Sequence, residues 1–276
     1  MPRILPLIIF GVLADALVLP QTGETDNLVL GQTVGFSSIK PSRELHWNPC
    51  HQDKRISCAV LKVPLDYEIP SLGETTIAYA KYSASHNKSA IDVLYNPGGP
   101  GGSGVDAVMG AGGDIAKRLG PGFNVIGFDP RGVSRSGPSL TCFPGDPQTR
   151  RRYMRTVQSE SESLPEQFAY MKARGEFCTK ANIYTHAKYC GTVAVVQDMN
   201  NFIDRNHAAK GQPGKARMYY YGASYGTVLG QTYAALFPER IERMLLDGNV
   251  YGVEYYKSVG PSFIHDTDAA FASFFE

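Results

Sequence analysis

The sequence has 276 residues, of which 43% are hydrophobic and 19% are charged. This much apolar material is enough for a sizeable core and excludes an intrinsically disordered chain. The 27 basic and 26 acidic side chains leave a formal net charge of +1, so no electrostatic argument favours nucleic acid or an anionic surface as a partner. The local run Arg150–Arg152, with Arg155, is interpreted as a solvated face.

The first residues have the pattern of a secretion signal. Arg3 provides a positive start, residues 4–13 form a short apolar stretch, and Ala14-Asp15-Ala16 fits a small-x-small cleavage site. The sequence therefore predicts a signal peptide over residues 1–16, with a short buried or membrane-associated helix as the alternative. The apolar run is shorter than the ~20 residues that a spanning helix needs. No other segment is long enough, so no membrane span is expected.

A change in pattern near Cys58 marks the expected start of the sheet. Residues 17–44 are polar, with scattered Gly and Thr, and are interpreted as a leader without a fold of its own. Residues 58–63 and 75–82 are rich in β-formers, and the segment between them contains the turn residues Pro and Gly. The two runs are predicted to form an antiparallel pair.

Later segments alternate between short apolar runs and helical patterns. This alternation indicates βαβ units and therefore an α/β class with a mostly parallel sheet covered on both faces. The expected strands are residues 91–95, 123–128, 216–221 and 241–246, and the expected helices are about 104–118, 191–206 and 225–237.

Two parts of the chain fit this alternation less well. Residues 133–190 are irregular and are interpreted as an excursion from the sheet, helical around 162–177. Residues 251–276 end on an apolar, helix-like segment. We interpret them as the start of a cap and expect the fold to be incomplete, with the last strands and most of the cap missing.

The chain contains five cysteines, Cys50, Cys58, Cys142, Cys178 and Cys190. Their spacings match no zinc pattern and no C-x-x-C is present, so disulfides and a secreted glycoprotein are favoured. Cys50 and Cys58 are close enough in sequence to form a disulfide where the chain enters the first strand. Two of the other three are expected to pair, and the sequence does not decide which. Asn87-Lys88-Ser89 is a glycosylation acceptor, which agrees with secretion.

The strongest chemical signal is Gly222-Ala-Ser-Tyr-Gly226, which follows an apolar strand and precedes an apolar helix. A serine hydroxyl is a weak nucleophile that must be exposed to a base and to the substrate carbonyl. A sharp strand-to-helix turn exposes it, and small residues two positions before and after it permit the close backbone approach. Ser224 is therefore the predicted nucleophile. In the alternative interpretation, Ser224 only caps the helix of a Gly-rich turn.

A second glycine-rich run, Asn96–Gly104, also lies between a strand and a helix. Its uncovered backbone N–H groups are suited to hold an oxyanion. The two expected donors are the N–H groups of Gly99 and Tyr225. A phosphate-binding loop is the rival interpretation. It is disfavoured because the Walker Lys and the G-x-G-x-x-G pattern are absent. No cofactor and no metal site are expected.

Three motifs occur here in a characteristic order, at residues 96–101 (NPGGPG), 127–137 (GFDPRGVSRSG) and 222–226 (GASYG). With them, residues 45–250 resemble the secreted tripeptidyl-aminopeptidase-like serine α/β-hydrolases, relatives of the proline iminopeptidases. The resemblance implies an α/β-hydrolase core. It also implies an exopeptidase that releases short peptides or single residues from N-termini through an acyl-enzyme on Ser224.

The second of these motifs includes Asp129 and Arg131, at the end of the strand expected over 123–128. We expect the two side chains to pair and to shape the loop beside the elbow. Direct participation in catalysis is the alternative.

The base and the acid that a serine nucleophile needs are less clear. In this fold they follow the serine in the order Asp or Glu, then His. The chain offers Asp247 and His265, which would form a compressed triad with Ser224. The resemblance implies instead that the acid and base lie further along, after a cap, with His265 on the first cap helix. Surface or core roles are expected for His46, His51, His86, His186 and His207.

Three functions therefore stay open. The first is the exopeptidase described above, and the second is a tailoring esterase, amidase or lactonase acting on a small metabolite. The expected partner is accordingly a peptide or a small ester or amide. The third is an inactive fragment that lacks the triad base and exposes an unfinished sheet edge, which is an aggregation hazard.

Overall fold

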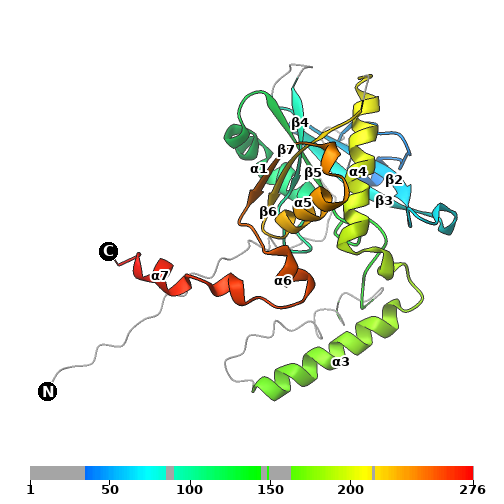
Figure 1. Cartoon of the computed structure of the whole chain (residues 1–276). Helices are drawn as coiled ribbons and strands as arrows, with labels where there is room; N and C mark the ends of the chain where they lie inside the picture. The colour runs from blue at the N-terminus through cyan, green and yellow to red at the C-terminus, as the bar shows by residue number, and fades with distance from the viewer. Residues whose placement is uncertain (1–34, 85–89, 144–147, 149–162, 213–214, 276) are drawn as a thin grey trace. The chain divides into compact units, whose positions relative to one another are not determined.

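The computed structural model describes residues 35–84, 90–143, 148, 163–212 and 215–275. They contain one seven-stranded sheet in the order β1-β2-β3-β5-β4-β6-β7 (Figure 1). Pairing is antiparallel from β1 to β5 and parallel from β5 through β4 and β6 to β7. The strands are β1 (Asn48–Pro49), β2 (Ile56–Pro64), β3 (Glu74–Tyr82), β4 (Ile91–Asn96), β5 (Phe123–Phe128), β6 (Met218–Ala223) and β7 (Ile241–Asp247).

Helices cover both faces of the sheet. α1 (Gly104–Leu119) packs on β3 and β5, whereas α4 (Thr192–Ala209) and α5 (Tyr225–Leu236) pack on each other, with α5 against β6 and β7. Because side chains alternate along a strand, β3 contributes to both layers. Ile77 and Tyr79 belong to the core under α4 and α5, and Ala78 and Ala80 belong to the core under α1. The expected α/β class, with a parallel sheet covered on both faces, is confirmed.

The boundaries differ from expectation mainly at the N-terminal edge. The interval 17–44 was expected to lack a fold, yet its last residues join the sheet. The Ser42 N–H donates to Val60 O at 3.1 Å, and Ser42 O accepts from the Lys62 N–H at 2.7 Å. Ile39 is buried nearby in the chain, after η1 (Phe36–Ser38). The predicted signal peptide over 1–16 and the acceptor Asn87 lie outside the described residues.

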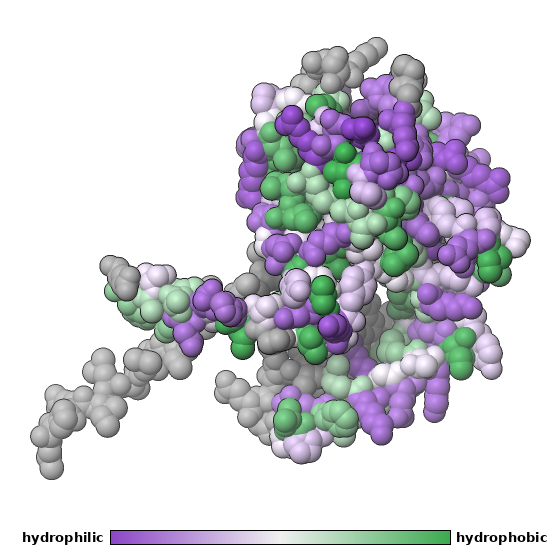
Figure 2. Space-filling view, in the orientation of Figure 1, coloured by the Kyte–Doolittle hydropathy of each residue, from purple (hydrophilic) through white to green (hydrophobic). Residues whose placement is uncertain are grey.

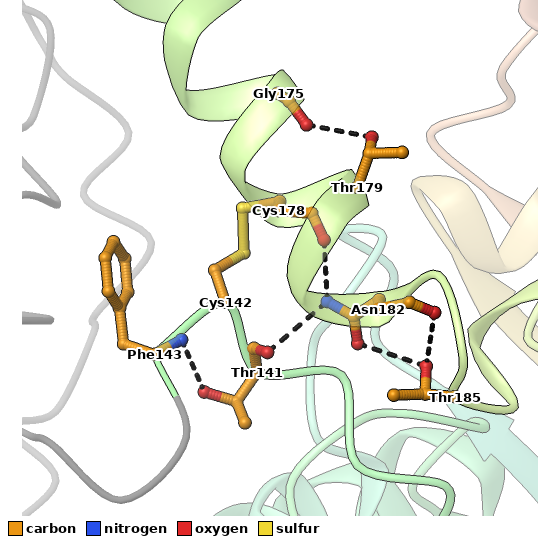
Figure 3. The surroundings of a disulfide bond; sticks show 8 residues. All are labelled: Thr141, Cys142, Phe143, Gly175, Cys178, Thr179, Asn182 and Thr185. Carbon is orange, nitrogen blue, oxygen red and sulfur yellow. Dashed lines mark hydrogen bonds between the residues drawn. A yellow bond between two sulfur atoms is a disulfide. The ribbon is translucent and has the colours of Figure 1, made fainter.

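The excursion contains α3 (Leu164–Asn182) and η3 (Ala187–Tyr189), so its helix begins and ends later than expected. None of the described α3 residues is buried. A disulfide joins Cys142 to Cys178 on α3, and Asn182 Nδ2 donates to Thr141 O at 3.3 Å and to Cys178 O at 2.9 Å (Figure 3). A disulfide, polar contacts and the stacking of Phe177 on Phe143 therefore hold this helix in place of a buried apolar face. A second disulfide joins Cys50 to Cys58, and Cys190 is free.

After β7 the chain forms three short elements, α6 (Gly252–Tyr256), η5 (Pro261–Ile264) and α7 (Thr267–Ala272). Apolar side chains are exposed on α7 and on α3, as Figure 2 shows, and β7 exposes Leu245 at the edge of the sheet. The other short elements are η2 (Pro70–Leu72) and η4 (Pro238–Arg240). Among the described helices, none combines the length and the hydropathy that crossing a membrane requires.

Candidate active site

Ser224 occupies the sharp turn between β6 and α5. Its backbone has φ 54° and ψ −121°, a conformation that costs a residue with a Cβ about 1–3 kcal/mol and is concentrated at functional sites. The side chain is exposed, and among the described residues it makes no hydrogen bond, including none that caps α5. The Ser224 N–H donates to Asp247 O at 2.9 Å, which ties the turn to the end of β7.

The glycines on either side of Ser224 are required by backbone contacts. A Cβ on Gly222 would lie 2.3 Å from Gly226 O. A Cβ on Gly226 would lie 2.7 Å from Asn96 O, at the end of β4. Both distances are far below any real Cβ contact, so only glycine fits. The folded chain therefore shows the close backbone approach that was expected to require small residues two positions before and after Ser224.

The loop after β4 lies directly against this turn. A Cβ on Gly98 would lie 2.5 Å from Ala223 O, 2.8 Å from Ser224 Cβ and 2.9 Å from Tyr225 N. The Gly98 N–H is used internally, because it donates to Asn96 Oδ1 at 2.9 Å. The next N–H, that of Gly99, has no acceptor among the described residues. Gly98 and Gly99 have φ values of +99° and +119°, which only glycine adopts readily.

Tyr225 is the first residue of α5, where a backbone N–H has no partner within the helix. Its side chain has a separate, structural role. The ring is buried, and its hydroxyl shares a hydrogen bond of 2.8 Å with Thr192 Oγ1, at the start of α4. Burial raises the pKa of Tyr225 to about 12, so the phenol stays neutral. The structure therefore places the loop that carries Gly99 beside both Ser224 and the Tyr225 N–H.

The two candidates for acid and base are placed differently. Asp247 ends β7, the strand next to β6. Its exposed carboxylate accepts a hydrogen bond from the Tyr221 hydroxyl at 2.8 Å. His265 is 79% exposed, and its Nδ1 pairs with Asp266 Oδ2 at 3.0 Å. Among the described residues, no histidine bonds to the Ser224 hydroxyl or to Asp247. The compressed triad is thus not formed.

The remaining histidines lie in other settings. His46 pairs with Glu44 at 3.6 Å, and His51 Nδ1 accepts from the Asp53 N–H at 3.1 Å. His186 packs beside Tyr189, and His86 lies outside the described residues. Within the described part of the chain, no group of three or more His, Cys, Asp or Glu side chains is arranged to hold a metal.

The expected pair Asp129–Arg131 is a wrong prediction. Arg131 is fully buried and pairs instead with Asp198 of α4, whose Oδ2 accepts from Nε at 2.7 Å. Asp198 Oδ1 also accepts from the Tyr67 hydroxyl at 2.8 Å, and burial raises the Asp198 pKa. Asp129 turns the other way, toward Ser103 at the start of α1. The chain bends between the two residues, so their side chains enter opposite layers.

The partners Asp198, Tyr67 and Ser103 were not identified from the sequence. Asp198 is 67 residues from Arg131, and Ser103 is 26 residues from Asp129. No local pattern marks such pairs, since each depends on how the layers pack.

Comparison with known proteins decides the family of this fold. A sequence model of the alpha/beta hydrolase fold matches residues 93–275, about two-thirds of the chain. The chain belongs to the alpha/beta hydrolase family. In this alpha/beta hydrolase the match includes the loop after β4, the turn at Ser224 and Asp247.

Three relatives show how the similarity is distributed. Serine protease Hip1 of Mycobacterium tuberculosis is 31% identical over 229 residues, which are 80% of this chain and 42% of that protein. Tripeptidyl aminopeptidase of Streptomyces coelicolor is 29% identical over 218 residues, 75% of this chain and 38% of that protein. Carboxylesterase B of M. tuberculosis is 34% identical over 151 residues, 49% of this chain and 28% of that protein. This alpha/beta hydrolase therefore spans less than half the length of these relatives.

Proposed function

We propose that this chain carries the nucleophile and the oxyanion site of a secreted serine hydrolase that removes short peptides or single residues from N-termini. The observation that carries the proposal is the geometry at Ser224. An exposed serine is held at φ 54° between β6 and α5, and Gly98 packs against its Cβ. The similarity to proteins named serine protease and tripeptidyl aminopeptidase supports a peptide substrate.

In the proposed reaction the Ser224 hydroxyl attacks the carbonyl carbon of the scissile bond and loses its proton to a base. The developing oxyanion accepts hydrogen bonds from the N–H groups of Gly99 and Tyr225, an interaction worth roughly 10²–10³ in rate for each donor. The intermediate collapses to an acyl-enzyme, and the base returns the proton to the leaving amine. Water then attacks the acyl group and regenerates Ser224.

The proposal assigns the nucleophile and the two donors and leaves the base and acid unassigned. Among the described residues, no histidine contacts the Ser224 hydroxyl. Asp247 stays a candidate acid because its backbone bonds to Ser224 N, and His265 stays a candidate base only if it leaves Asp266.

Secretion is part of the same proposal. Two disulfides, Cys50–Cys58 and Cys142–Cys178, favour an oxidising compartment, where such bonds persist. Cleavage after residue 16 and glycosylation at Asn87 are the accompanying predictions. Mass spectrometry of the mature protein from a secreting host would detect both.

A second candidate function is ester hydrolysis. Similarity to Carboxylesterase B over 151 residues favours it, and the same nucleophile and donors serve both reactions. Comparing kcat/KM for a tripeptidyl amide, an aminoacyl amide and a simple aryl ester would separate them. A preference for both amides supports the peptidase, and activity on the ester alone supports the esterase.

The direct test of the nucleophile is covalent labelling with a fluorophosphonate. We expect labelling of the wild type and none of Ser224→Ala. Ser262→Ala is the matched control, because the hydroxyl of this serine bonds only to Glu254 among the described residues, on the segment after β7, and the variant should label normally. Equal labelling of Ser224→Ala and wild type would overturn the assignment. Absence of labelling in a folded, monodisperse wild type would overturn activity of this chain alone.

A further inference from the structure

The loop from Pro97 to Ser103, which carries Gly99, is fastened at both of its ends. At its start, Gly98 packs against the turn at Ser224, as described above. At its exit, the first turn of α1 meets the end of β5 through backbone atoms. A Cβ on Gly104 would lie 2.3 Å from Phe128 O, and one on Gly127 would lie 1.9 Å from Gly104 O.

The carboxylate of Asp129 joins the exit of the loop to the end of β5. Asp129 is fully buried, and its Oδ1 accepts from the Ser103 hydroxyl at 2.5 Å and from the Val105 N–H at 3.2 Å. Its Oδ2 accepts from the Arg135 N–H at 3.2 Å and lies 3.8 Å from Arg135 Nη1. Ser103 is at the same time the N-cap of α1, because its Oγ accepts from the Asp106 N–H.

The charge of Asp129 is well placed for this role. A carboxylate is favoured at the N-terminus of a helix, and α1 is 16 residues long. Burial raises the pKa of Asp129, while the hydrogen bonds from Ser103, Arg135 and Val105 lower it and partly offset the cost of burial. A buried carboxylate with several donors strongly restrains the groups that bond to it. Ser103, four residues after Gly99, is the group restrained here.

We propose that Asp129 is a positioning residue for the oxyanion site: by holding Ser103, its carboxylate keeps the Gly99 N–H in register with the Tyr225 N–H. Asp129 does not touch the substrate and acts only through the loop. The inference rests on the proposed function for its catalytic consequence. The restraint on the loop is a separate, physical claim that stands without activity.

Three variants test this inference. Asp129→Asn keeps the shape of the side chain and removes its charge, while Ser103→Ala removes the hydroxyl that bonds to it. Ser103→Thr is the conservative variant, which keeps the hydroxyl. Asp114→Asn is the matched control, since it is the same substitution at an exposed position of α1 that pairs with Lys117. Asp198→Asn reports general destabilisation, because this equally buried carboxylate does not contact the loop.

Two measurements separate positioning from a merely structural role. Hydrogen–deuterium exchange should become at least tenfold faster in peptides covering residues 97–104 of Asp129→Asn and Ser103→Ala, with little change in peptides from α5. Labelling of Ser224 by the fluorophosphonate should slow by at least tenfold at saturation, while the half-saturating concentration stays within twofold. Ser103→Thr and Asp114→Asn should match the wild type in both measurements, and Asp198→Asn should not accelerate exchange selectively in the loop.

The outcomes distinguish this inference from the proposed function. Unchanged exchange over residues 97–104 in both Asp129→Asn and Ser103→Ala would overturn it, as would an equal increase throughout the sheet. If Asp129→Asn does not fold, Ser103→Ala decides alone. If the folded wild type is not labelled, activity of this chain alone is ruled out, while the exchange experiment still decides whether Asp129 holds the loop. Normal labelling with a loosened loop would overturn the catalytic part of the inference.

Discussion

The turn at Ser224 and the excursion that carries α3 are held together in opposite ways. At the turn, backbone atoms of β4, β6 and α5 touch through Gly98, Gly222 and Gly226. In α3, no described residue is buried, and a disulfide with the bonds of Asn182 holds the helix. The turn therefore tolerates almost no change in shape, whereas we expect α3 to tolerate changes with little effect on the sheet. The following predictions test this contrast, from the largest expected effect to the smallest.

Breaking the buried Arg131–Asp198 pair should have the largest effect on stability. Arg131→Met leaves the Asp198 carboxylate buried without its charged partner, which costs about 3–5 kcal/mol. Arg217→Met removes an exposed pair with Glu242 and should cost about 0–1 kcal/mol. Urea denaturation measures both free energies of unfolding. Equal losses in the two variants would show that burial of the Arg131 pair is not what matters.

Adding one methyl group beside the nucleophile should have the next largest effect on stability. Gly98→Ala forces a Cβ to within 2.5–2.9 Å of the turn and requires a residue at φ +99°, which we expect to cost about 1–3 kcal/mol and to abolish fluorophosphonate labelling. Gly175→Ala is the matched control in α3. It meets open space and should stabilise the helix by up to about 1 kcal/mol. Normal labelling of Gly98→Ala would contradict the close fit of loop and turn.

A smaller effect is expected where the start of α4, just after the excursion, reaches the turn. Thr192→Val removes the hydroxyl that pairs with Tyr225 and should cost about 1 kcal/mol. Thr185→Val, within the excursion, removes the exposed bonds of this hydroxyl to Asn182 and to the Ala187 N–H and should cost less than about 0.5 kcal/mol. Thermal denaturation compares the two. Identical midpoints would mean that the hydroxyl pair contributes nothing to the attachment.

Removing the disulfide of the excursion should affect the sheet least. Cys142→Ser with Cys178→Ser opens a link spanning 36 residues, which would cost about 4 kcal/mol if α3 unfolded together with the sheet. Because no described residue of α3 is fully buried, we expect a change in global unfolding below about 0.5 kcal/mol, with faster hydrogen exchange confined to residues 163–182. Cys50→Ser with Cys58→Ser, at a buried pair, should cost about 2–3 kcal/mol globally. A global loss of several kcal/mol in the first double variant would contradict the contrast.

Much of the core was predictable because its signals are local. The helices α1, α4 and α5 and the parallel strands were located to within a few residues, since each depends on the periodicity of its own segment. Glycines two positions either side of Ser224 signalled the turn for the same reason. The end of the interval 17–44 was missed, because its pairing with β2 depends on Val60 and Lys62 and not on its own polar composition.

The partners of Asp129 and Arg131 were decided by tertiary structure alone. Asp129 and Arg131 stand two positions apart, and their neighbourhood in sequence suggested a pair. In the fold, Asp129 bonds to Ser103 under one layer, and Arg131 pairs with Asp198 in the other. The sequence by itself determined where the chain turns sharply and which residue the turn exposes, because a tight turn requires small neighbours. Which buried groups pair with Asp129 and Arg131 depended on the packing of distant segments, which no local pattern encodes.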